Sequence, residues 1–251
     1  MVKFYFYVFL VFIGSISCQG LQSLVECPDG EGASGVGQCV PQSDDEKAVL
    51  AMNSGDYSSA QELLEALIAA EPEVYIRYPR LATVYALQGG VDLLEIAQSQ
   101  SSGESSGSGL DSIGAFLPEP DPDQMEDYTA KVTKVGLAKD TLNRIPAAEL
   151  LELKAKFQLS IYQSAYSVMY MNQFVIPVSP GSNEISAESL ENLTPEAALV
   201  ILSNLRSSSS NIAEEDPEAA EKIDAVLEQI DAQEGGSDDE KLQEFLKAQN
   251  S

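Results

Sequence analysis

From residue 44 onward, hydrophobic residues recur every three or four positions, which is the spacing of one face of an α-helix. The clearest stripe consists of Ala60, Leu63, Leu64, Leu67 and Ile68. Asn53-Ser54-Gly55 ends the helix before it, and Glu71-Pro72 ends this one, because a residue that precedes proline disfavours helical backbone. No segment is predicted as a strand. The pattern therefore predicts an all-α protein.

The second half of the chain predicts five more helices. They run from Asp123 to Arg144, from Ala147 to about Phe174, from Pro195 to about Leu205, from Pro217 to about Ala232, and onward from Ser237. Thr194 is expected to cap the third of these and Asp216 to start the fourth, each with proline at the first helical position. The serines at 207–210 are interpreted as a frayed helix end or a loop.

The helix from Ala147 to Phe174 is predicted to be the long central helix of an irregular helical domain. Its C-terminal half is apolar on every side, which is typical of a buried helix. We interpret its tyrosines and methionines as core. The alternative is an apolar ligand cavity, whose candidate lining residues are Phe157, Tyr162, Tyr166 and Tyr170.

Residues 44–98 resemble the tetratricopeptide repeat, a helical hairpin of 34 residues. The residues that match its motif positions in the first unit are Gly55, Asp56, Tyr57, Ala60, Leu64 and Pro72. A step of 34 residues leads to Gly89 as a second turn glycine, preceded by the matching residues Tyr78, Leu81, Ala82 and Tyr85. Pro79 departs from the pattern and predicts a shortened or kinked helix. The alternative is an ordinary helical hairpin.

Two repeats are fewer than the roughly three that an independent solenoid needs. The hairpins at 44–98 are therefore expected to pack against the helix around residues 157–174. Residues 99–122, rich first in Ser and Gly and then in Pro and Asp, are predicted to be a flexible linker. Residues 123–251 are expected to complete the same domain.

The first 17 residues read as a secretory signal peptide. Lys3 precedes an apolar run from Phe4 to Ile13 that is too short to remain as a membrane span, and small residues follow it. Ser17-Cys18 resembles the bacterial lipobox, in which the cysteine becomes the lipidated first residue, although Ser15 stands where the family prefers leucine. Ordinary cleavage, giving a secreted or periplasmic soluble protein, is the alternative.

The odd number of cysteines favours lipidation of Cys18. The chain has three cysteines, and Cys27 and Cys39 flank a short glycine-rich segment that a disulfide could close. Such a bridge would stabilise the tether, residues 18–43, by about 3 kcal/mol. Cys18 would then remain alone, and lipidation would remove its thiol. The lipoprotein sorting rule implies the outer membrane, facing the periplasm, because Gln19 is not aspartate.

Composition limits the chemistry of this chain. Its 40 acidic and 14 basic residues give a net charge of -26, which opposes binding to nucleic acid or to an anionic membrane surface. The chain has no histidine, which excludes Ser-His-Asp and Cys-His catalysis. The carboxylates at Asp121, Asp123, Glu126 and Asp127 lack EF-hand spacing, so helix-start acidity is expected there and casual Ca²⁺ binding is the alternative. No enzyme activity, metal or cofactor is expected.

The whole layout resembles small bacterial envelope lipoproteins with degenerate tetratricopeptide helices. These include the helical lipoproteins associated with tripartite periplasmic (TRAP) transporters and the helical-repeat lipoprotein of outer-membrane protein assembly. The resemblance implies a non-enzymatic scaffold that binds an envelope protein and touches the membrane only through its N-terminal lipid. The alternative is a carrier of a small hydrophobic ligand or a transporter-associated subunit.

Overall fold

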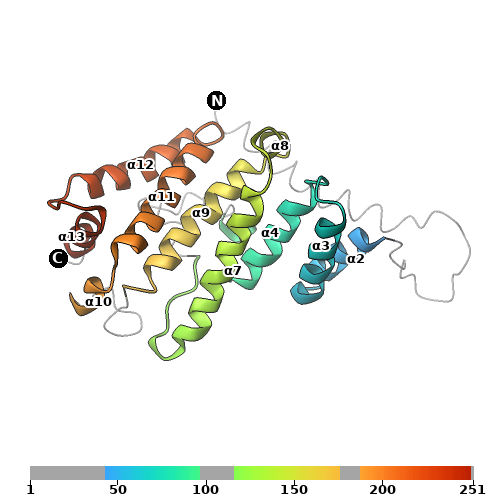
Figure 1. The fold of residues 1–251 in the computed structure, drawn as a ribbon, viewed down its shortest axis with the longest axis horizontal. Coiled ribbons are helices and arrows are strands. Elements are labelled where there is room, and N and C mark those ends of the chain that lie inside the picture. The colour runs from blue at the N-terminus through green and yellow to red at the C-terminus, as the bar shows by residue number, and fades with distance from the viewer. Residues whose placement is uncertain (1–42, 97–115, 176–186, 250–251) are drawn as a thin grey trace, which may run out of the picture. The chain divides into compact units, whose positions relative to one another are not determined.

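The computed structural model describes residues 43–96, 116–175 and 187–249. Within these ranges the chain forms α-helices, one short 3-10 helix and no strand, which confirms the all-α prediction (Figure 1). The helices are α2 (Asp44–Asn53), α3 (Tyr57–Ala70), α4 (Arg77–Gln88), η1 (Pro122–Gln124), α7 (Met125–Asn143), α8 (Ala147–Glu152), α9 (Lys156–Met171), α10 (Ala187–Glu191), α11 (Pro195–Ile212), α12 (Pro217–Asp231) and α13 (Asp238–Gln249). None of these described helices has the length and apolar character that crossing a bilayer requires.

The chain divides into two compact units, Met1–Lys47 and Ala48–Ser251. Of the first unit, only residues 43–47 are described. They open α2 with a capping box, in which the Ser43 hydroxyl accepts from the Glu46 N–H at 3.2 Å and the Glu46 carboxylate accepts from the Ser43 N–H at 3.1 Å.

Helices of the second unit pack mainly in chain order. α3 packs on α4, α4 on α7, α7 on α9, α9 on α11 and α11 on α12, while α13 packs on both α11 and α12 (Figure 1). Two hydrophobic clusters result, one drawn from α2 through α9 and the other from the end of α9 through α13. Phe157 and Tyr170, at the two ends of α9, pack against both clusters. α9 therefore joins the two halves of the core.

The predicted long helix is broken, so that prediction is wrong as to length. Lys154 separates α8 from α9 and has a positive φ of 54°. The Lys154 N–H donates to the Leu151 carbonyl and the Ala155 N–H to the Leu150 carbonyl, each at 3.0 Å, which is a Schellman motif. Glycine usually occupies this left-handed position. A lysine there gives no sequence signal for a helix end.

Schellman motifs also close α2 and α4, and here glycine supplies the left-handed residue. Gly55 has a φ of 79°, in agreement with its predicted place at the first turn. At the second turn the left-handed residue is Gly90, with a φ of 77°, and not the predicted Gly89, whose φ is −78°. Gly89 is needed for space, because a Cβ atom there would lie 2.6 Å from Val135 Cγ2 of α7.

The hairpins of the first half pack on α7, so the prediction that they pack on the helix around 157–174 is wrong. α9 contacts α4 through Gln158, whose Nε2 donates to the Pro79 carbonyl at 3.2 Å and to Thr83 Oγ1 at 2.9 Å. Pro79 is the third residue of α4 and causes no break, since a backbone N–H in the first turn has no partner within the helix.

The predicted flexible linker at 99–122 is packed at its C-terminal end. Residues 97–115 lie outside the described ranges. Leu117 is buried in the first cluster and Phe116 packs against it. A Cβ atom at Gly90 would lie 2.7 Å from Pro118 Cγ, so this segment also touches the end of α4. Burial of these apolar side chains offsets the cost of ordering the segment.

The starts of α11 and α12 were predicted correctly, but the starts of α9 and α10 and the end of α11 were not. Thr194 Oγ1 accepts from the Ala197 N–H at 3.2 Å and Asp216 Oδ1 accepts from the Ala219 N–H at 3.0 Å. α11 continues through the serines at 207–210 to Ile212, and Ser208 and Ser209 are buried. The serines predicted to form a frayed end therefore belong to a helix, and Ser208 packs against α9.

Buried serines hold α11 against α9. Ser208 Oγ lies 2.8 Å from Ser160 Oγ and 2.6 Å from Ser164 Oγ, and it donates to the Ser160 carbonyl at 2.9 Å. Ser167 Oγ donates to the Ile201 carbonyl at 3.2 Å. Small side chains let the two helices approach closely, and their mutual hydrogen bonds satisfy polar groups that would be costly to bury alone.

Candidate functional site

The residues that match the repeat motif fall on α3, on α4 and in the turns beside them. Ala60 and Leu64 are fully buried on α3, and Tyr78, Ala82 and Tyr85 are buried on α4. Tyr57 begins α3 and is half-buried, while exposed Pro72 lies in the connection between α3 and α4. Cys18, Cys27 and Cys39 lie outside the described residues.

Polar contacts of α4 fasten it to α3. Tyr85 Oη donates a short hydrogen bond to Glu65, and Gln61 Nε2 donates to the same carboxylate at 2.8 Å. Burial and the neighbouring Glu65 raise the pKa of Tyr85 far above its ordinary value. Tyr78 Oη donates to the Pro72 carbonyl at 2.9 Å. Both tyrosine rings are thereby fixed on the side of α4 that meets α7.

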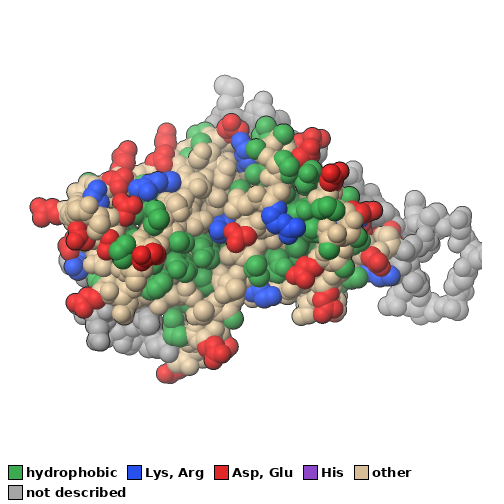
Figure 2. Space-filling model, viewed as in Figure 1, with side chains coloured by type: hydrophobic (Ala, Val, Ile, Leu, Met, Phe, Trp, Pro, Cys, Tyr) green, Lys and Arg blue, Asp and Glu red, His purple; other side chains and the backbone are tan. Residues whose placement is uncertain are grey.

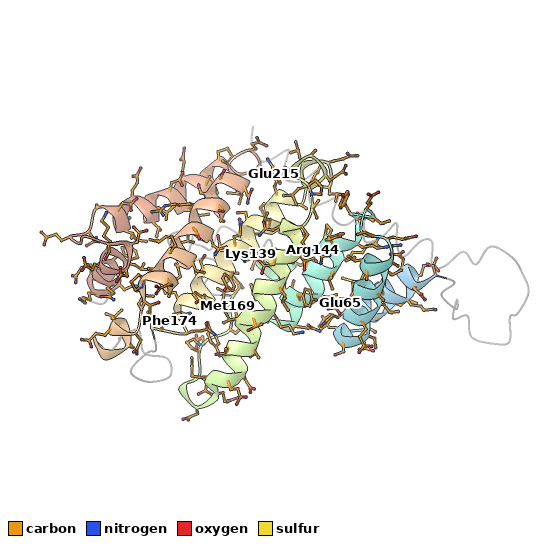
Figure 3. The ribbon with its side chains drawn as sticks, viewed as in Figure 1. Glu65, Lys139, Arg144, Met169, Phe174 and Glu215 are labelled. Atoms are coloured by element: carbon orange, nitrogen blue, oxygen red, sulfur yellow. The ribbon has the colours of Figure 1, made fainter. Side chains whose placement is uncertain are left out.

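α7 and its C-terminal cap place three cations over tyrosine rings of the helices on either side. Lys134 Nζ lies 5.4 Å from the ring centroid of Tyr85, and Arg144 Cζ lies 5.0 Å from that of Tyr78. Lys139 Nζ lies 5.1 Å from the ring centroid of Tyr166 on α9. Each pair is a cation–π contact of about 0.5–1 kcal/mol. Figure 3 marks Lys139 on α7, Arg144 at the C-terminal cap of α7, and Glu65 on α3.

An aromatic row follows α9 and continues past its end. Its members are Tyr166, Tyr170 and Phe174, which share one side because four residues make about one helical turn. The rings of Tyr166 and Tyr170 stack with centroids 5.4 Å apart, and Phe174 meets Tyr170 edge-on at 5.2 Å. All three are half-buried. In Figure 2, hydrophobic side chains gather over this part of the face in view.

Gly136 of α7 allows Tyr166 to lie close against that helix. A Cβ atom at Gly136 would be 3.0 Å from Tyr166 Cε2, tighter than an ordinary contact. Lys139 then reaches the same ring and pairs with Asp140 at 2.8 Å, although its side chain is only 15% exposed. The aromatic row therefore begins at a charged pair on α7.

The residues expected to line a ligand cavity do not share one surface. Tyr162 is fully buried, Gln158 Nε2 donates to its hydroxyl at 3.0 Å, and burial raises its pKa to about 12. Phe157 precedes Tyr166 by nine residues, which is half a turn out of phase and puts the two on opposite sides of α9. Only Tyr166 and Tyr170 lie together at the surface.

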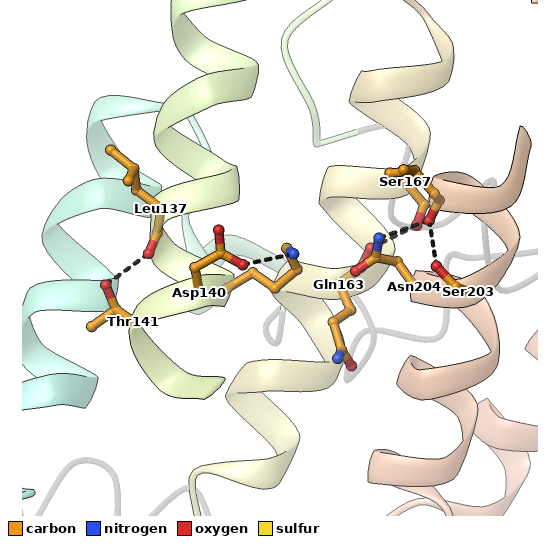
Figure 4. A network of polar contacts seen from close by, with 9 residues as sticks. Leu137, Asp140, Thr141, Gln163, Ser167, Ser203 and Asn204 are labelled. Carbon is orange, nitrogen blue, oxygen red and sulfur yellow. Dashed lines mark hydrogen bonds and ion pairs between the residues drawn. The ribbon is translucent and has the colours of Figure 1, made fainter. Parts of the chain in front are cut away.

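Polar side chains near the aromatic row donate hydrogen bonds to backbone carbonyls of their own helices. Thr141 Oγ1 donates to the Leu137 carbonyl at 2.7 Å, Ser167 Oγ to the Gln163 carbonyl at 2.8 Å and Asn204 Nδ2 to the Val200 carbonyl at 2.7 Å (Figure 4). Such local bonds are ordinary for these residue types in helices. The face of α7, α9 and α11 therefore offers a partner aromatic and cationic groups more than free hydroxyls and amides.

The predicted carboxylate cluster serves local structure. Asp121 Oδ1 accepts from the Asp123 N–H at 3.0 Å, and its other oxygen accepts from Gln124 Nε2 at 2.7 Å, so Asp121 caps η1. Over the described ranges, no three carboxylate or cysteine side chains lie close enough to hold a metal ion together.

Comparison of the chain with protein-family models, with curated proteins and with solved structures finds no match. The cations of α7 are the residues of this site that sequence reasoning missed. Their signal was present, because Lys134, Lys139 and Arg144 fall on one helix of a strongly acidic chain. The tyrosines beneath them belong to other helices, so the helical pattern did not connect them.

Proposed function

We propose that this protein is an exported, non-enzymatic helical scaffold that binds a partner protein in the bacterial envelope. The aromatic row of α9 is the observation that carries the proposal. Partly exposed tyrosine and phenylalanine rings, fixed by a rigid helix and bordered by cations, are the groups that contribute most to protein–protein binding.

The tetratricopeptide-like character of the scaffold is part of this proposal. Three features support it: left-handed glycines close α2 and α4, the small and large motif positions Ala60 and Leu64 are buried, and the helices from α3 onward pack mainly in chain order. A stack of helical hairpins exposes extended faces of side chains, and repeat proteins use such faces to bind partners.

Affinity capture from envelope extracts in mild detergent tests the function. The wild-type protein should retain a specific protein partner. Tyr170→Ala should lower its retention about tenfold or more, because central aromatic anchors are typical hot spots. Tyr75→Ala is the matched control, since Tyr75 is another half-buried tyrosine outside the aromatic row, and it should retain the partner. If the wild type captures no specific protein, the scaffold proposal is wrong.

We also propose that Cys18 carries lipid and anchors the protein to the outer membrane, facing the periplasm. The support is the lipobox-like Ser17-Cys18 and the odd number of cysteines. Metabolic labelling with palmitate should mark the wild type and leave Cys18→Ala unlabelled. Labelling of the variant would contradict the anchor.

A second candidate is a carrier of a small hydrophobic ligand, as in a transporter-associated subunit. The stacked, half-buried pair Tyr166–Tyr170 favours it, because stacked rings can hold a flat apolar molecule. Native mass spectrometry of the purified protein separates the two functions. A co-purifying small molecule that is lost in Tyr166→Ala would support the carrier, and the bare protein mass would count against it.

A further inference from the structure

Basic residues are concentrated on two neighbouring helices of this acidic protein. Residues 77–88 of α4 and 131–144 of α7 and its cap hold six of the chain's 14 basic residues, and Asp140 is their only acidic one. The two stretches together carry a net charge of +5, six basic residues against one acidic, while the whole chain carries -26. In Figure 2, basic side chains lie among acidic and hydrophobic ones over this part of the surface, and others lie at the left end of the view.

Three of these cations have no carboxylate partner among the residues that the structure describes: Lys131, Lys134 and Arg144. Lys134 Nζ donates to the neutral Gln61 Oε1 at 3.0 Å and lies over Tyr85, and Arg144 lies over Tyr78. Several cations elsewhere are paired, as in Lys156–Glu214, Lys222–Glu218 and Lys247–Glu244, while Lys154 and Lys241 form no ion pair among the described residues. The chain has almost three acidic residues for each basic one, so carboxylate partners are plentiful. Cations that lie over tyrosine rings and have no carboxylate partner therefore indicate a place where an anion binds.

Two of these cations flank an exposed leucine. Lys134, Leu137 and Arg144 follow each other by three and seven residues, which puts them on one side of the helix. The rise of α7 separates Lys134 from Arg144 by about 15 Å. Leu137 lies between them with 40% of its surface exposed. We call these three residues the α7 stripe.

Among the described residues, no carboxylate forms an ion pair with Lys134 or Arg144 of the α7 stripe. Glu65 accepts hydrogen bonds from Tyr85 and Gln61, and Asp140 pairs with Lys139. The large negative charge of the whole chain also acts weakly here, because exposed charges beyond about 10 Å are screened at ordinary ionic strength. Local cations therefore decide what this surface attracts.

We propose that the α7 stripe binds an acidic segment of the partner protein, and this rests on the proposed scaffold function. The segment presents two carboxylates about 15 Å apart, roughly three turns of a helix, with an apolar side chain between them. The carboxylates meet Lys134 and Arg144, and the apolar side chain covers Leu137. An apolar contact between two cations fits an amphipathic helix better than the evenly charged surface of an anionic lipid layer.

Site-specific photo-crosslinking in the native host tests this inference. A p-benzoylphenylalanine at Leu137 is compared with one at Leu199 of α11, which is 58% exposed and outside the stripe. The Leu137 variant should crosslink to the captured partner, and mass spectrometry should place the link in a segment with acidic residues on both sides of an apolar one.

Charge variants of the Leu137 crosslinking protein supply the matched control. Lys134→Gln with Arg144→Gln should lower the crosslink yield about tenfold or more, since hydrogen bonds between charged groups are the stronger ones. Lys222→Gln with Lys247→Gln removes the same charge from exposed ion pairs on α12 and α13 and should leave the yield unchanged. Thermal unfolding of both double variants confirms that each is folded.

The outcomes separate the inference from the function. If the wild type captures a partner and Leu137 links to a neutral or basic segment, to lipid, to a second copy of the chain, or to nothing, the inference is wrong and the scaffold stands. Equal losses in the two double variants would likewise overturn the inference. If the wild type captures no partner and neither position crosslinks, the scaffold proposal itself is wrong.

Discussion

Ser208 is a fully buried hydroxyl that links two helices far apart in sequence. Its Oγ meets Ser160 and Ser164, which precede it by 48 and 44 residues. From the sequence alone, Ser208 belonged to a run of four polar residues typical of a helix end. Burial reverses that interpretation, because a polar group away from water must find a partner in the fold.

Ser208→Ala should lower the free energy of unfolding by about 1–3 kcal/mol, because Ser164 Oγ would be left buried without its partner. Ser210→Ala, an exposed position on the same helix, should change it by less than about 0.5 kcal/mol. Urea denaturation followed by circular dichroism measures both. Equal small effects would show that the serine contact does not stabilise the interface.

Glu215, between α11 and α12, gives a pH dependence. Glu215 is exposed as a whole, but desolvation of its carboxyl raises its pKa, and Lys154 and Lys156 nearby only partly oppose the rise. A carboxyl with a raised pKa in the folded state favours folding while it is protonated, and that contribution is lost as pH rises through the folded pKa. Glu215→Gln should therefore raise the melting temperature at pH 7 and leave it nearly unchanged at pH 4. A melting temperature equally raised at both pH values would contradict this explanation.

Helix starts and helix ends differ in how well sequence predicts them. N-caps act on a backbone N–H three residues away, so Thr194 and Asp216 were recognisable in the sequence. The end of α8 depends on a left-handed residue at 154, and lysine adopts that conformation only because the surrounding contacts favour it. Burial of Leu150 before the turn and of Ala155 after it offsets the steric cost of the left-handed conformation at Lys154.

Lys154→Gly should stabilise the protein by about 0.5–1 kcal/mol, because glycine reaches the left-handed conformation without the steric cost that lysine has. The same substitution at Lys222, in the interior of α12, should destabilise by about 1 kcal/mol. Urea denaturation of the two variants compares them directly. If Lys154→Gly also destabilises by about 1 kcal/mol, the lysine side chain contributes more than its backbone conformation costs.

At the scale of the whole second unit, α9 couples two hydrophobic clusters. Phe157 and Tyr170 pack against both, and the serines of α9 bond to α11. One helix that completes two cores cannot leave either without exposing the other. The unit is therefore expected to unfold in a single transition.

Leu64→Ala in the first cluster and Ile223→Ala in the second should each lower the free energy of unfolding by about 2–5 kcal/mol. Tyrosine fluorescence reports mainly the first cluster, because every described tyrosine packs in it, only Tyr170 also touches the second, and the chain has no tryptophan. Far-ultraviolet circular dichroism reports both clusters. The two signals should coincide in both variants. Separate transitions in Ile223→Ala would show that the clusters fold independently.

The sequence by itself determined which segments are helical and where most of them begin. Those properties depend on residues one to four positions apart: the hydrophobic period, the N-caps and the glycine that closes α2. The fold class followed from them, as did the buried side of α3, on which Ala60, Leu64 and Ile68 lie.

Tertiary structure alone decided which helices meet and which side chains form the candidate binding face. Gln61 and Lys134 are 73 residues apart, and Tyr166 meets Gly136 and Lys139 across two helices. Helical periodicity indicates that a helix has a buried side, but it does not say which other helix covers that side. The cations of α7 became candidate binding residues only because packing places them over the tyrosine rings of α4 and α9.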